Sequence, residues 1–101
     1  MITRVVKINF KEDKINDFLQ HFETIKWMVA SQENCHGMKL YQDKNQENIV
    51  FTYSIWSDEN ALENYRKSIF FNDLWSTIKP WFKEKAEAWT LNEHFNGFNN
   101  K

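Results

Sequence analysis

The chain has 101 residues, of which 42% are hydrophobic and 17% aromatic, a composition that fits one globular domain with a core rich in Phe and Trp. Its 13 basic and 14 acidic residues give a formal charge of -1, and they are spread along the chain. No basic stripe is present that could neutralise a phosphate backbone, which excludes nucleic acid as an expected partner.

The first residues and the cysteine content indicate the cellular compartment of the protein. Arg4 and Lys7 interrupt the apolar residues at the start of the chain, so we expect neither a signal peptide nor a membrane span. Cys35 is the only cysteine, which rules out an internal disulfide. These features predict a cytoplasmic protein without a membrane partner.

The first half of the chain predicts a strand, a helix and two more strands. Residues Ile2 to Phe10 alternate between apolar and polar, with Arg4 as an exception on the apolar face. Apolar residues at helical spacing from Ile15 to Val29 predict an amphipathic helix. Met38 to Asp43 and Ile49 to Trp56 are predicted as strands on either side of a polar loop.

Two helices separated by a break are predicted after the third strand. Asp58, with Ser57, can cap a helix whose apolar residues extend to Tyr65. The next apolar stripe begins at Phe71 and is about half a turn out of phase with the first. The helix must therefore break near Ser68, whose side chain either caps the second helix or bonds a ligand.

A last strand and a tail complete the predicted domain. Pro80 removes a backbone donor and should kink or end the second helix. A strand from Ala86 to about Phe95 follows, and residues 96–101 are expected to form a flexible tail. The order β-α-β-β-α(α)-β over residues 1–95 predicts a single α+β domain of ferredoxin-like fold, a four-stranded antiparallel sheet with helices on one face.

The aromatic content and the bare face of the sheet both predict a homodimer. A domain of this size buries only roughly 60 to 65% of its unfolded surface, so one copy is not expected to hide five Trp and nine Phe. Trp27 lies nearly opposite the apolar stripe of its helix and is either exposed or covered by another subunit. A second copy packed sheet against sheet would cover the face that the helices leave open.

Several short motifs occur in an order that matches a known family. The turn Cys35-His36-Gly37 precedes the second strand, and the third strand ends at Trp56 before Ser-Asp-Glu-Asn-Ala-Leu. The segment Tyr65-Arg66-Lys67-Ser68-Ile69-Phe70-Phe71 follows, and then Trp75, Lys79 and Ala88-Trp89. Over residues 2 to 95 the chain thus resembles the antibiotic biosynthesis monooxygenase family of dimeric α+β barrels, and it is closest to small unassigned members.

The resemblance implies an oxidoreductase that needs no cofactor. It implies a monooxygenase that oxidises a small aromatic or quinol-like compound with molecular oxygen. In such relatives an electron-rich substrate reduces oxygen itself, and the protein binds a flat apolar molecule, promotes loss of a proton and stabilises the anion. The alternatives are a non-catalytic dimeric module that binds a small apolar metabolite and, less favoured, a heme-binding or heme-degrading relative.

The chain departs from two branches of the family. The heme-degrading branch uses an Asn on the first strand and a Trp and a His on the helical segment. The best matching positions here are Val6, Tyr65 and Trp75, so no axial ligand for heme iron is evident. The quinol-oxidising branch often has His where this chain has Tyr65 and Phe70, and its acid–base groups therefore do not carry over.

Three residues are candidates for catalysis, and each has a structural alternative. Trp75 could stack on a planar substrate while Tyr65 donates or relays a proton to its oxygen, or both could pack the helices on the sheet. His36 could act as a base near pH 7 or could be a turn residue with a satisfied ring.

Further residues are candidates for substrate binding. Arg4 is either a buried cation paired with a carboxylate or phenolic oxygen, or a side chain that reaches past the end of the sheet to solvent. Arg66 and Lys79 either are solvated charges or hold an anionic group of the substrate. The full set of substrate-binding candidates is Arg4, Trp56, Arg66, Ser68, Phe71 and Asn72.

No metal site is predicted from the sequence. His21, His36, His94 and Cys35 are scattered and lack the close spacing of metal ligands. Cys35 has no activating base nearby in sequence and is interpreted as a small hydrophobic residue.

Overall fold

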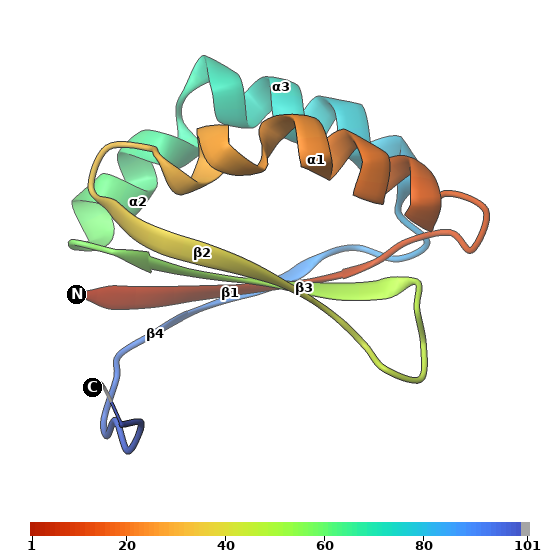
Figure 1. The fold of residues 1–101 in the computed structure, drawn as a ribbon. Coiled ribbons are helices and arrows are strands. Elements are labelled where there is room, and N and C mark those ends of the chain that lie inside the picture. The colour runs from red at the N-terminus through yellow and green to blue at the C-terminus, as the bar shows by residue number, and fades with distance from the viewer. Residues whose placement is uncertain (100–101) are drawn as a thin grey trace.

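The fold is an antiparallel four-stranded sheet with helices packed on one face (Figure 1). The structure is a computed structural model, in which residues 1–99 are described. The elements are β1 (Ile2–Asn9), α1 (Ile15–Ala30), β2 (Cys35–Gln42), β3 (Ile49–Trp56), α2 (Glu59–Arg66), α3 (Ile69–Ile78), the 3-10 helix η1 (Lys79–Trp81) and β4 (Glu87–Leu91). The strand order is β2-β3-β1-β4, which confirms the predicted ferredoxin-like α+β fold.

The central strands β1 and β3 set the face on which each side chain lies. Ile2 pairs with Trp56 at one end of the ladder, and Ile8 pairs with Val50 near the other. Since side chains alternate across a strand, all four of these residues point to the same face. They are buried, which identifies this face as the one that the helices cover.

Two separate clusters of buried residues join the helices to the sheet. One contains Phe10 and Phe18, whose rings stack with centroids 4.4 Å apart, together with Ile8, Ile15, Val50 and Ile78. The other consists of Ile2, Trp56, Ala61 and Leu62. Because Ile2 and Ile8 lie near opposite ends of β1, the two clusters support the helices at the two ends of the sheet. The middle of the strand is left between them.

The predicted helix break is confirmed at Ser68. The Ser68 hydroxyl accepts a hydrogen bond from the Phe71 amide at 3.1 Å and donates to the Tyr65 carbonyl at 2.6 Å. Asp58 caps α2 by accepting from the Ala61 amide at 2.8 Å. α3 continues into η1, which contains Pro80, so the proline lies at the end of the helix, as predicted.

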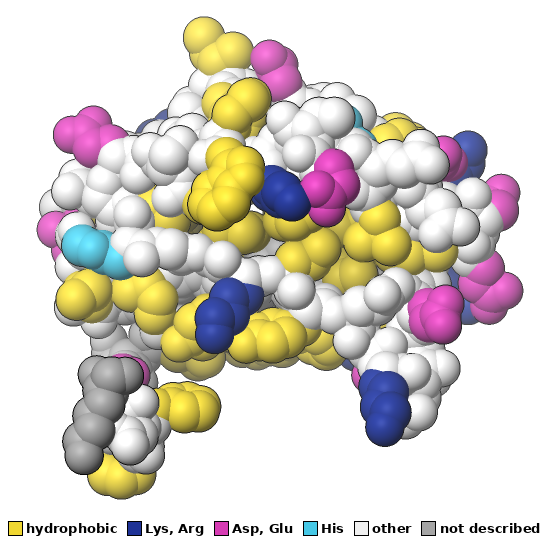
Figure 2. All heavy atoms as spheres, viewed as in Figure 1, with side chains coloured by type: hydrophobic (Ala, Val, Ile, Leu, Met, Phe, Trp, Pro, Cys, Tyr) yellow, Lys and Arg dark blue, Asp and Glu magenta, His cyan; other side chains and the backbone are white. Residues whose placement is uncertain are grey.

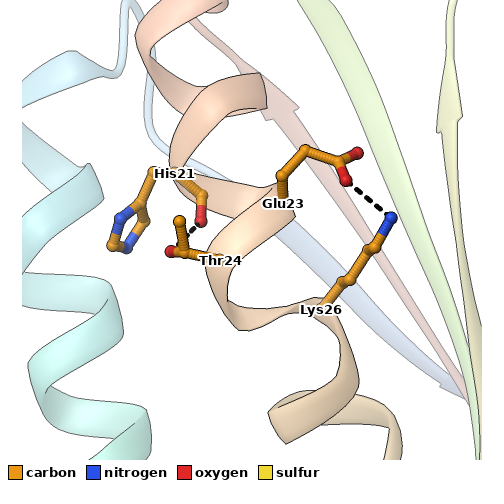
Figure 3. A network of polar contacts seen from close by, with 4 residues as sticks. All are labelled: His21, Glu23, Thr24 and Lys26. Carbon is orange, nitrogen blue, oxygen red and sulfur yellow. Dashed lines mark hydrogen bonds and ion pairs between the residues drawn. The ribbon is translucent and has the colours of Figure 1, made fainter.

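Helix α1 carries different polar groups on its two sides (Figure 3). His21 points toward α3, and its ring meets Trp81 edge-on with centroids 6.1 Å apart. On the other side, Lys26 donates to Glu23 at 2.6 Å. Trp27 is 76% exposed within this single chain. The helix therefore packs against both α3 and the sheet while Trp27 remains uncovered.

Two strands, β4 and β2, differ from their predicted bounds by more than one residue. β4 ends at Leu91 rather than near Phe95, because β1 is its only neighbour and the pairing stops at Thr3 with Leu91. β2 begins at Cys35 rather than Met38, since an irregularity at His36 lets Cys35 pair with Trp56. Residues 92–99 form neither helix nor strand, and the last two residues of the predicted tail lie outside the described residues. No helix within residues 1–99 is long and apolar enough to cross a membrane.

Replacement of Ser68 by alanine tests the cap at the break. S68A removes the acceptor for the Phe71 amide and should lower the free energy of unfolding by about 1 kcal/mol, as measured by urea denaturation. S76A is the matched control, because Ser76 is exposed within α3, where alanine is the better helix former. A loss for S76A as large as that for S68A would contradict the assigned cap.

Candidate functional site

A partly enclosed cavity of about 360 Å³ lies between the helices and the covered face of the sheet. This volume is at the lower end of the range of about 300–1,000 Å³ that is usual for small-molecule sites. Its walls come from every helix and strand of the domain: Arg4, Val6 and Ile8 of β1; Phe18, Phe22, Ile25 and Val29 of α1; Met38 of β2; Thr52, Ser54 and Trp56 of β3; Leu62, Tyr65 and Arg66 of α2; Phe71, Asn72, Leu74, Trp75 and Ile78 of α3; Lys79 of η1; Ala88 of β4; and Ala86 just before it.

The cavity brings together most of the candidate site residues. Those that line it are Arg4, Trp56, Tyr65, Arg66, Phe71, Asn72 and Trp75. Ser68 does not line it, because its hydroxyl is used in the cap of α3. His36 is exposed on the edge strand, where its Nε2 lies 2.8 Å from the Ser57 hydroxyl, and it is not a lining residue either.

A continuous row of aromatic rings forms one wall of the cavity. Tyr65 stacks on Trp56 with centroids 4.9 Å apart and meets Phe71 edge-on at 5.1 Å. Phe71 in turn lies 5.6 Å from Trp75. Trp56 is fixed in place because its indole N–H donates to the Ser54 hydroxyl at 2.9 Å. A wall of this kind offers ring faces and edges to a flat molecule.

Tyr65 is held in its neutral form. Burial raises the pKa of the Tyr65 phenol well above its ordinary value of 10.0, and the nearby Cys35 adds a smaller contribution in the same direction. A phenol in this environment is a hydrogen-bond donor at neutral pH and is a poor base.

Positive charge gathers around Arg4, which extends from the middle of β1. Its Nη1 donates to the Thr90 hydroxyl of β4 at 2.8 Å, a neutral partner in place of the carboxylate or phenolic oxygen considered from the sequence. Arg66 forms an ion pair with Glu63 at 2.8 Å. Burial lowers the pKa of Arg4, the positive charge of Arg66 lowers it further, and Glu63 partly opposes both effects.

Several lining residues were not among the candidates from the sequence, and those of α1 and of the middle of β3 are examples. Phe22 and Ile25 belong to the same apolar stripe as the core residues of α1, so their spacing alone cannot separate a cavity wall from a packed core. Thr52 and Ser54 could have been recognised in the sequence as cavity residues, since they are small and polar on the strand face that also carries Val50 and Trp56.

Comparison with known proteins agrees with this architecture. The model of the antibiotic biosynthesis monooxygenase family matches residues 1–101. The chain belongs to this family. No curated protein matches the chain in a sequence search.

Solved structures of antibiotic biosynthesis monooxygenases share the fold at low sequence identity. One crystal structure with that name superposes with a TM-score of 0.86 at 15% identity, covering 92% of this chain and 98% of the other. A candidate member from Nitrosomonas europaea gives 0.86 at 12% identity over 94% and 100% of the two chains. A conserved protein from Methanosarcina mazei gives 0.84 at 20% identity over 92% and 93%. At these identities the likeness concerns the fold alone.

The raised pKa of Tyr65 makes the stability of this monooxygenase family member depend on pH at the alkaline end. In the unfolded chain Tyr65 should ionise near pH 10, whereas in the folded chain it ionises only at higher pH. Above about pH 10 the unfolded state therefore binds fewer protons, and stability should fall as pH rises. We expect urea denaturation between pH 8 and 11 to show a steeper fall for the wild type than for Y65F. Parallel curves for the two proteins would contradict the burial effect.

Proposed function

We propose that the protein is a cofactor-independent monooxygenase that oxidises a small aromatic or quinol-like compound with molecular oxygen in this cavity. The proposal is carried by one observation: the row of aromatic rings that includes Tyr65 lines the same cavity as several positively charged side chains. In this assignment Trp75 stacks on the flat substrate, and Tyr65 donates a hydrogen bond to a substrate oxygen. His36 has no part in it, since it lies outside the cavity.

The charges of the cavity suggest how the substrate is activated. The described residues that line it include Arg4, Arg66 and Lys79 but no Asp, Glu or His. Nothing among them has the ordinary pKa of a general base near neutral pH. Positive groups instead favour the ionised form of a bound hydroxyl, which lowers its pKa and lets the proton leave to water. Activation would thus be mainly electrostatic.

The substrate supplies all the electrons in the proposed reaction. In an anthrone-like compound the substrate anion forms a carbon–oxygen bond with molecular oxygen. Loss of water then breaks the oxygen–oxygen bond and leaves a carbonyl, so that a CH₂ group and O₂ give C=O and H₂O. The protein needs only to bind the molecule and to stabilise the anion.

We propose that the functional form is a cytoplasmic homodimer of the 1–95 domain, formed through the open face of the sheet. By the strand register, this face carries Val5, Tyr41, Phe51, Tyr53, Ile55, Trp89 and Leu91. Tyr41, Trp89 and Leu91 are 51%, 43% and 45% exposed in the single chain. Figure 2 shows hydrophobic side chains along the lower side of the molecule, beneath the sheet. An apolar surface of this extent favours association with a second copy.

A charge at the centre of this face tests the dimer. Tyr53 lies on the central strand β3, so Y53E would remove an apolar ring and place a carboxylate within the contact, where burial of a charge is costly even beside Lys39 of the paired strand β2. We expect the wild type to run at twice the monomer mass in light scattering after gel filtration, and Y53E to run as a monomer. T77E, on an exposed position of α3, is the control and should remain dimeric. A monomeric wild type at micromolar concentration would rule out the proposed dimer.

A non-catalytic binding module is the second candidate. The absence of a carboxylate or imidazole among the described lining residues favours it, because a cavity that only holds a ligand needs no base. The same dimer and ring-lined wall would then sequester or sense a small apolar metabolite. Heme binding has less support, since none of the lining residues is a His or a Cys.

Oxygen consumption separates the first two candidates. With reduced naphthoquinones under air, the wild type should take up oxygen faster than the spontaneous rate. The Y65F/W75F double variant should lose about tenfold or more of that excess. W27F is the matched control, because Trp27 is exposed on α1 and does not line the cavity. No excess uptake by a wild type that still binds the compound would favour the binding module.

A further inference from the structure

The cavity contains positive charge that the described part of the chain does not fully neutralise. Arg4 and Arg66 contribute two positive charges, and Glu63 contributes one negative charge, which leaves one positive charge in this group. Glu63 is committed to Arg66 at 2.8 Å, whereas Arg4 bonds to the neutral hydroxyl of Thr90. Lys79 also lines the cavity, but it is not among the charges that act on Arg4, so it stays outside this group.

The surroundings of Arg4 favour a monovalent anion with a planar, two-oxygen group. The guanidinium is partly buried beside apolar residues, where a counter-charge is worth more than in water. Among the described residues its one side-chain hydrogen bond runs from Nη1 to Thr90, so the rest of its fork remains to bind two oxygens side by side. A carboxylate fits that geometry and would balance the single excess charge, whereas a phosphate would bring close to two charges at neutral pH.

The rest of the cavity lining indicates the apolar part of the ligand. Val6 and Ala88 lie next to Arg4 and Thr90 along the paired strands β1 and β4, and both line the cavity. Small side chains there leave room for a ring, and Phe71 and Trp75 supply the aromatic surface. One ligand could therefore place an aromatic body against the rings and an acidic group at Arg4.

We propose that the cavity selects a planar aromatic carboxylate, with Arg4 as the residue that recognises the carboxylate. The inference rests on the proposed function only in taking this cavity as the substrate site. It narrows the small aromatic compound to an aromatic acid.

Two probes that differ only in the carboxylate test the proposal by binding, without turnover. Titration calorimetry at pH 7 with 1-hydroxy-2-naphthoate and with 1-naphthol should give the wild type an affinity about tenfold or more higher for the acid, as expected for a charged hydrogen bond. R4M should bind both compounds within about threefold of each other, with its affinity for 1-naphthol little changed. R4K keeps the charge but loses the fork, and it should retain only part of the preference.

A second charge variant separates recognition from a general effect of charge. K67M removes one positive charge from an exposed side chain next to Arg66 that does not line the cavity, and it should keep the preference of the wild type. Equal affinity of the wild type for the two probes, no binding of the acid, or a preference that survives in R4M would each overturn the proposal. This test measures binding, whereas the monooxygenase proposal is tested by oxygen uptake. Selective binding of the acid without oxygen uptake would therefore support this proposal and contradict only the monooxygenase activity.

Discussion

The pairing of β1 with β3 at the centre of the sheet is the constraint on which the rest of the structure depends. Its register places large apolar residues at both ends of the covered face, Ile2 with Trp56 and Ile8 with Val50. Between them it places Arg4 opposite Ser54 and Val6 opposite Thr52. The helices rest on the bulky ends, and the smaller side chains in the middle of β3 do not fill the space beneath them. The cavity is thus a consequence of side-chain size along one strand pair.

The helix break at Ser68 gives this space its aromatic wall. In one uninterrupted helix the apolar residues of α2 and those of α3 would point in directions about half a turn apart. The break lets Tyr65 from α2 and Phe71 from α3 meet edge-on at 5.1 Å over the same space. The bond from Ser68 to the Tyr65 carbonyl, at 2.6 Å, joins the cap of α3 directly to the residue that presents the phenol. The same serine hydroxyl therefore caps α3 and holds the backbone of the residue that presents the phenol to the cavity.

The sequence predicted those features that depend on local patterns. Strand β3 was predicted with its observed bounds, because alternating bulky residues stand between a polar loop and a capped helix. The break at Ser68 followed from the change of phase. β4 was predicted too long because its length is set by pairing with a distant strand, and that pairing ends at Leu91.

The parts of the site that were not predicted depend on contacts distant in sequence. Arg4 meets Thr90, 86 residues away, and nothing near either residue indicates the other. His36 was grouped with the site because the sequence predicted a turn there, next to a glycine, whereas the structure has it in β2. Its position depends on the irregularity in the β2–β3 ladder, which leaves it exposed beside Ser57. The walls supplied by α1 were hidden for a related reason, since a core and a cavity require the same apolar stripe.

The positive groups of the cavity would have two tasks if the substrate is both acidic and oxidisable, and these tasks compete. A carboxylate that neutralises Arg4 also weakens the pull of Arg4 on any second negative charge, because opposite charges at short range cancel. The hydroxyl that must ionise is therefore best placed away from the carboxylate. Tyr65, neutral through burial, can donate a hydrogen bond to the resulting anion without adding a charge of its own. A ligand that presents its acid to Arg4 and its hydroxyl to Tyr65 would use Arg4 for binding, while the phenol and the other positive groups of the cavity stabilise the ionised hydroxyl.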